Sequence, residues 1–149
     1  MALLSIPVAL ALTGCGGLAL RPADFGWPVE SVLSIDSNGM AEDDRYNIIF
    51  NAKPLLFAET GDSVNVSKHS LRMIRDKEGY YFITAVGFKN VYVFASAEGA
   101  LVIHNIIAVS EKGLEAPAFN QRPPFVQLLN GKEKAKLLNM DGVQEGVKK

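Results

Sequence analysis

The chain has 149 residues, a formal net charge of −1, one cysteine and 48% hydrophobic residues. This length suffices for one domain with a sizeable hydrophobic core, and the composition is that of a folded chain rather than a disordered one. The near-zero net charge excludes the basic surface that nucleic-acid binding needs, so we expect no nucleic-acid partner. A single cysteine excludes an intramolecular disulfide, so packing alone must hold the domain together.

The first segment of the chain is apolar and carries no charged residue before Arg21. Residues 1–11 match the apolar core of a secretory signal, which is followed by small residues at the cleavage site. The next four residues are Leu12-Thr13-Gly14-Cys15. They resemble the lipobox of bacterial lipoproteins, in which the cysteine thiol receives diacylglycerol and the signal peptidase cuts just before that cysteine.

This resemblance implies a chain anchored in the bacterial cell envelope through a lipid on Cys15. Residues 1–14 would be the cleaved signal peptide, and residues 15–28 would form a lipidated tether. The periplasmic face of the outer membrane is preferred over the inner membrane. The sequence departs from the family pattern because no Lys or Arg precedes Arg21, and an uncleaved membrane anchor over residues 3–20 stays open as an alternative.

The segment from residue 29 to residue 130 has the pattern of a β domain. Short apolar runs are separated by loops that contain Gly, which is typical of an antiparallel meander. Strands are expected at residues 29–35, 46–50, 71–75, 80–86, 91–96 and 100–109. Asp36-Ser37-Asn38-Gly39 predicts a turn, which the acidic residues 42–44 prolong as a loop. We therefore predict an all-β, mainly antiparallel domain of about seven to nine strands, folded as a sandwich, with a small barrel as the alternative.

Three further segments have a less regular pattern. Pro54 prevents a continuous inner strand, so residues 55–58 are expected to form a separate or edge strand. Residues 126–129 fit a last strand or one helical turn, and residues 132–140 fit a short C-terminal helix. Apart from that helix, residues 131–149 are expected to be a polar C-terminal tail.

The longest predicted strand, residues 100–109, is apolar on both faces. One face would carry Leu101, Ile103, Ile107 and Val109, and the other Val102, Ile106 and Ala108. An antiparallel strand with one face in water alternates apolar with polar residues, and this one does not. We therefore expect its second face to be covered by a second sheet, a helix, a barrel interior or a partner protein.

Residues 117–125 contain three prolines and two phenylalanines. Proline favours an extended backbone and removes hydrogen-bond donors, so this segment is expected to be ordered by docking of Phe119 and Phe125. Arg122 lies between them and can bind a carboxylate through two hydrogen bonds. Phe119, Arg122 and Phe125 are therefore a candidate partner-binding set. The alternative is that the segment packs across the domain's own sheet and covers its apolar face.

No catalytic, metal or cofactor site is predicted. The two histidines, His69 and His104, fall short of a zinc ligand set, and no serine stands in a Gly-x-Ser-x-Gly motif. The acidic loop of residues 36–44 departs from the calcium-loop pattern, and no nucleotide-binding motif is present. We interpret His104 as a hydrogen-bonded strand residue and His69 as a solvent-exposed one.

The functional expectation follows from the anchor and from these exclusions. We expect a non-enzymatic, membrane-anchored lipoprotein that acts as a structural or assembly subunit of an envelope complex, with another envelope protein as its partner. The alternative is a carrier that binds a small apolar ligand among the aromatic residues of the segment 80–94. The simpler interpretation of those aromatic residues is that they form the domain core.

Overall fold

The computed structural model describes residues 29–145. The predicted signal peptide, the lipobox with Cys15 and the tether lie outside the described residues. The elements in chain order are β1 (Ser31–Ser34), β2 (Met40–Asp43), β3 (Ile48–Asn51), α1 (Lys53–Thr60), the 3-10 helix η1 (Val66–Lys68), β4 (Ser70–Arg75), β5 (Tyr81–Ala85), β6 (Asn90–Ala97), β7 (Ala100–Ala108), β8 (Pro117–Arg122), β9 (Phe125–Asn130), β10 (Lys136–Asn139) and β11 (Gly142–Gln144).

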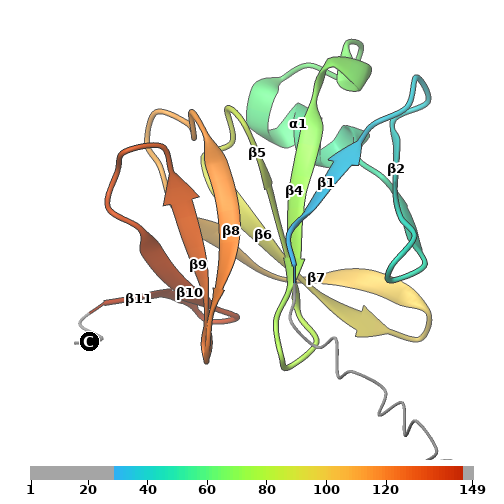
Figure 1. Ribbon diagram of the computed structural model, residues 1–149. Helices are drawn as coiled ribbons and strands as arrows, with labels where there is room; N and C mark the ends of the chain where they lie inside the picture. Colours follow the sequence, from blue (N-terminus) through green and yellow to red (C-terminus); the bar gives the residue numbers. More distant parts are fainter. Residues whose placement is uncertain (1–28, 146–149) are drawn as a thin grey trace, which may run out of the picture.

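These elements form three layers (Figure 1). The central sheet has five antiparallel strands in the order β1-β4-β5-β6-β7, and the outer sheet has four in the order β11-β10-β9-β8. The β2–β3 hairpin and α1 pack against the other face of the central sheet. The predicted all-β antiparallel sandwich is confirmed, and the described residues do not close into a barrel. The meander prediction holds for β4 to β7, although the described residues form eleven strands rather than seven to nine.

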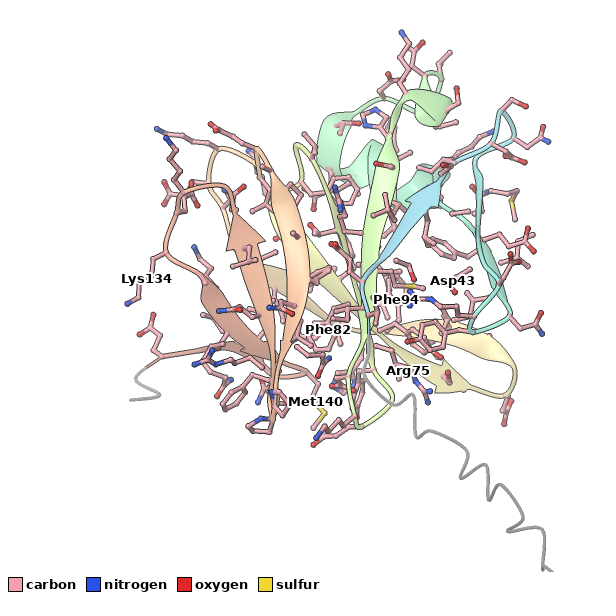
Figure 2. The ribbon with its side chains drawn as sticks, viewed as in Figure 1. Asp43, Arg75, Phe82, Phe94, Lys134 and Met140 are labelled. Carbon is pink, nitrogen blue, oxygen red and sulfur yellow. The ribbon has the colours of Figure 1, made fainter. Side chains whose placement is uncertain are left out.

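The central sheet is buried on both faces, which gives the domain two hydrophobic cores. All five residues of β5 are buried. Phe82 of β5 faces the core between the central and outer sheets, where Figure 2 shows it. Its neighbour Ile83 faces the second core, which α1 and the β2–β3 hairpin cover. A continuous apolar run is expected of a strand that has no face in water.

The strand predicted at residues 55–58 is wrong, because these residues lie in helix α1. Pro54 stands in the first turn of the helix, where a missing N–H breaks no helical hydrogen bond and the fixed φ of proline fits. Gly61 ends the helix with a φ of 71°, and its N–H donates to the carbonyl of Phe57 at 2.9 Å. Leu56 is fully buried and docks the helix on the central sheet.

The outer sheet continues into residues that were expected to form a polar tail. Residues 132–140 contribute β10 instead of the short helix, because Leu138 points into the core with 0% exposure. β10 pairs with β9 on one side and with β11 on the other, so the sheet runs on to Gln144. β10 forms its hydrogen bonds with β9 and β11. The few apolar residues of this segment did not reveal that these strands would lie beside it.

Strand β7 contains a β-bulge at His104. Val93 of β6 pairs with Asn105, but the next residue of β6 pairs with Ile103, so His104 is the extra residue. The extra residue reverses the predicted alternation, and Ile103 joins Ile106 on one face of the strand. These two side chains are 53% and 50% exposed, so the described residues cover this face only in part.

Candidate partner-binding groove

The structure separates Phe119 from the other two residues of the candidate partner-binding set. Phe119 lies in β8 with only 5% of its surface exposed and packs in the core between the two sheets. This is the placement that the capping alternative expects. Arg122 is exposed and Phe125 half-buried, and the two are register partners at the turn of the β8–β9 hairpin. Their role in partner binding stays a prediction, and Cys15 lies outside the described residues.

The structure also places the two histidines and the aromatic residues of the segment 80–94. His104 is exposed on β7, and its ring centroid lies 4.9 Å from that of Tyr80. His69, which was interpreted as solvent-exposed, is half-buried at the end of the short helix η1. Within residues 29–145, no group of three or more His, Cys, Asp or Glu side chains could hold a metal ion. Phe82 of β5, Phe88 of the turn between β5 and β6, and other aromatic side chains of these two strands fill the two cores.

A groove of about 330 Å³ opens between β1 and the β2–β3 hairpin. Its lining residues are Val32, Leu33, Ser34, Ile35, Asp36, Met40, Glu42 and Ile49. Val32 and Ile49 expose large aliphatic surfaces, 54% and 63% of the residue respectively. Asp36 and Glu42 are its two charged lining residues, so the groove combines apolar side chains with a negative charge.

One end of the groove is closed where β1 turns into β2. Ile35 and Ala41 form an isolated bridge between the two strands. The Oδ1 atom of Asp36 accepts the backbone N–H groups of Asn38 and Met40, each at 2.8 Å, and so fixes the predicted turn. The walls of the groove therefore diverge from a fixed corner.

A buried carboxylate fixes the other end. Asp43 is 4% exposed, and its Oδ1 accepts the backbone N–H groups of Arg45 at 2.9 Å and Tyr46 at 3.3 Å. Its Oδ2 accepts the hydroxyl of Ser31, and the Arg45 guanidinium lies 3.7 Å from that oxygen. The same guanidinium donates to the carbonyl of Val29 at 3.0 Å and to the Ser31 hydroxyl. These contacts satisfy the charge and tie the start of β1 to the β2–β3 turn, near which Figure 2 labels Asp43.

Between these two ends, β1 presents an open strand edge to the groove. β1 pairs with β4 through four residues on one side, but with β2 only through the bridge at Ile35. No other strand among residues 29–145 pairs with this outer edge. Open edges of this kind bind extended peptides by strand addition, in which the main chain supplies hydrogen bonds and the side chains supply specificity.

The sequence predicted two of the strands around this groove, β1 and β3. It did not predict β2, which falls in the stretch expected to be a turn and an acidic loop, and it did not predict the groove itself. Val32 and Ile49 belong to segments that were predicted as strands, residues 29–35 and 46–50. The pattern does not show which side chains face outward, because that depends on how the β2–β3 hairpin packs. The sequence contains no local signal for this packing.

Comparison of the chain with protein-family models, with curated proteins and with solved structures gives no match. In the part of the chain that the structure describes, no helix has both the length and the apolar character needed to cross a membrane.

Proposed function

We propose that the protein is a non-enzymatic, lipid-anchored lipoprotein of the bacterial cell envelope that acts as a structural or assembly subunit by binding another envelope protein. The groove between β1 and the β2–β3 hairpin supports the binding part of this proposal. The lipobox-like sequence ending at Cys15 supports the anchor. The predicted tether of residues 15–28 ends two residues before β1 in the sequence, and β1 is one wall of the groove, so a lipid on Cys15 would keep the binding surface near the membrane.

The chemistry of the groove defines the partner segment that fits it. The open edge of β1 requires an extended main chain, and the exposed Val32 and Ile49 favour apolar side chains on one face of that chain. Asp36 and Glu42 favour a basic residue beside them. The proposed ligand is therefore an extended segment of an envelope protein that alternates apolar side chains with Lys or Arg.

The test places a photo-cross-linking amino acid at Ile49 in the native envelope. The matched control carries it at Phe57, which is 60% exposed on α1 and does not line the groove, against 63% for Ile49. We expect one discrete envelope protein to cross-link at position 49 and not at position 57. Mass spectrometry of the same material should show diacylglycerol on Cys15, and Cys15→Ala should release the chain from the membrane fraction.

Two results would contradict the proposal, and each concerns a different part. Equal products from positions 49 and 57 would show that the groove has no special role in binding. A mature chain that keeps residues 1–14 and has no lipid on Cys15 would show that the anchor assignment is wrong.

A further inference from the structure

The β6–β7 hairpin projects beyond the layers of the domain as an arm, here defined as residues 94–104. Figure 1 shows it in yellow, extending away from the outer sheet. Residues 96–100 at its end are all exposed. The hairpin closes through a two-residue turn, Glu98-Gly99, whose φ angles of 48° and 78° are those of the tight turn that suits the twist of paired strands.

The turn determines which main-chain groups of the arm are free. Ala97 and Ala100 flank the two-residue turn and pair with each other, so they form the hydrogen-bonded pair that closes it. Hydrogen-bonded and non-hydrogen-bonded pairs then alternate along an antiparallel ladder. The N–H and C=O groups of Val102 therefore face β6, whereas those of Leu101 and Ile103 point away from it, toward the outer edge.

Side chains occupy backbone groups on the rest of the β7 edge and on the edge of the outer sheet. Just past the bulge, the side-chain oxygen of Asn105 accepts the N–H of Ile106 at 2.8 Å, and its amide nitrogen donates to the carbonyl of Met140 at 3.1 Å. In the outer sheet, the edge strand β8 has its Phe119 N–H bonded to the carboxylate of Glu30 at 2.9 Å. In contrast, residues 100–104 have no strand on their outer side among residues 29–145.

The chemistry of the free segment suits a contact with itself. Residues 100–109 contain no proline, lysine, arginine or carboxylate, the residues with which proteins commonly block an exposed edge. Val102 and Ile103 are 49% and 53% exposed. In a two-fold antiparallel pair, the residue on the axis faces its own copy, so a charged residue there would meet a like charge, and a charged residue beside the axis would face an apolar one. This segment contains no Lys, Arg, Asp or Glu to produce such a clash.

We propose that residues 100–104 of β7 pair antiparallel with the same residues of a second copy, about a two-fold axis at Val102. In this register Leu101 lies opposite Ile103 of the second copy, so the free main-chain groups of these residues meet and bond. The two Val102 residues form a non-hydrogen-bonded pair, with Cα atoms about 4.5 Å apart. The two five-stranded central sheets then become one continuous sheet.

The contact is short, so dimer formation is expected to depend on concentration. A common membrane surface would raise the effective concentration of the two copies and favour the dimer. The pairing involves neither the groove nor Cys15, and failure of the proposed function would leave it standing.

The test is a disulfide between the two copies of residue 102. The full-length chain carries Cys15→Ala, which removes the native thiol, together with Val102→Cys, and is oxidised in detergent solution. Because non-hydrogen-bonded pairs bring two cysteines within disulfide range, we expect a disulfide-linked dimer. Ile103→Cys is the matched control: it is equally exposed, but its copies would lie beyond the limit of about 7 Å between Cα atoms, so it should cross-link several-fold more slowly. Val86→Cys, on a residue 56% exposed in the β5–β6 turn, gives the rate of random collision.

A charge on the edge provides an independent check. Ile103→Lys added to Val102→Cys should strongly reduce the cross-link, because a lysine would then face the apolar Leu101 of the second copy. The proposal is overturned if Val102→Cys cross-links no faster than Val86→Cys, if Ile103→Cys matches it, or if Ile103→Lys has no effect. Melting curves verify that each variant is folded. Should Val102→Cys fail to fold, sedimentation of the Cys15→Ala chain at increasing concentration decides, with Ile103→Lys expected to lower the dimer fraction and an unchanged fraction overturning the proposal.

Discussion

A single carboxylate, that of Glu59, joins helix α1 to the central sheet. One of its oxygens accepts the side-chain amide of Asn90 at 2.7 Å and the hydroxyl of Tyr92 at 2.9 Å. The other oxygen accepts the backbone N–H of Lys89 at 2.7 Å. Burial of Tyr92, together with its hydrogen bond to Glu59 and the negative charge there, raises the pKa of Tyr92 to about 12. The neutral phenol is therefore the form that the folded state favours.

This raised pKa predicts a loss of stability in alkali. Between pH 10 and pH 12, Tyr92 ionises in the unfolded chain but stays protonated in the folded one, so the folded state binds more protons. The free energy of unfolding should then fall as the pH rises through this window. In urea titrations at several pH values, Tyr92→Phe should show a shallower fall than the parent chain. An identical pH dependence of the two proteins would contradict the assignment.

Local signals among the polar residues were readable from the sequence, and long-range ones were not. The turn at Asp36 was predicted correctly, because its two determinants are local. The Asp36 side chain bonds a backbone N–H two residues on, and Gly39 adopts a positive φ. Asp43 was assigned to an acidic loop, yet it is buried in β2. Its burial depends on Ser31 and Arg45, and the first of these lies twelve residues away. No local pattern identifies such a partner.

The same division applies to whole elements. β4 to β7 were predicted to within a few residues, because their alternation and Gly-containing turns are local features. α1 and β10 were not, since a short apolar run fits a helix or a strand equally well and tertiary packing decides. The groove and the arm depend on how strand edges are arranged after folding. The sequence placed β1, β3, β6 and β7 on strands, but it assigned β2 to a loop and could not show which strand edges stay open.

The segment that connects the central sheet to the outer sheet requires glycine at position 113. Gly113 has a φ of 97°, and a Cβ there would lie 2.7 Å from the carbonyl oxygen of Gly87. That contact is close because the N–H of Gly87 donates to the carbonyl of Leu114 at 2.7 Å. Gly61, at the end of α1, has a similar positive φ of 71°, but a Cβ added there would meet no atom within 4 Å.

Gly113→Ala and Gly61→Ala therefore separate backbone strain from steric overlap. Each substitution forces a residue with a Cβ into the left-handed region, at a cost of roughly 1–3 kcal/mol. Gly113→Ala must in addition displace backbone, so it should lower the free energy of unfolding clearly more than Gly61→Ala. Urea unfolding of the two variants measures the difference. Equal losses would mean that the connection can move aside at little cost.

At the scale of the whole molecule, the central sheet is the common wall of two cores and the source of both proposed contacts. Its order places β1, which lines the groove, at one edge and β7, which carries the arm, at the other. Partner binding and self-pairing would therefore use different strands. Among the described residues, β1 and β7 are the edge strands of this sheet, and each has a sheet neighbour on one side only. Each contact therefore depends on the outer sheet, the β2–β3 hairpin and α1 to hold the central sheet in place.

Two matched substitutions test whether this shared sheet makes the domain one cooperative unit. Leu56→Ala empties a site under α1, and Leu138→Ala empties one under the outer sheet, both residues being fully buried. Each should lower the free energy of unfolding by about 2–5 kcal/mol. β5 contributes to both cores. Hydrogen exchange of its amides in the native state should therefore accelerate in each variant, by an amount that matches the loss of unfolding free energy in that variant. The double variant should lose about the sum, within roughly 0.5 kcal/mol, because the two sites belong to different cores. If Leu138→Ala left the exchange of β5 unchanged, the outer sheet would unfold as a separate unit.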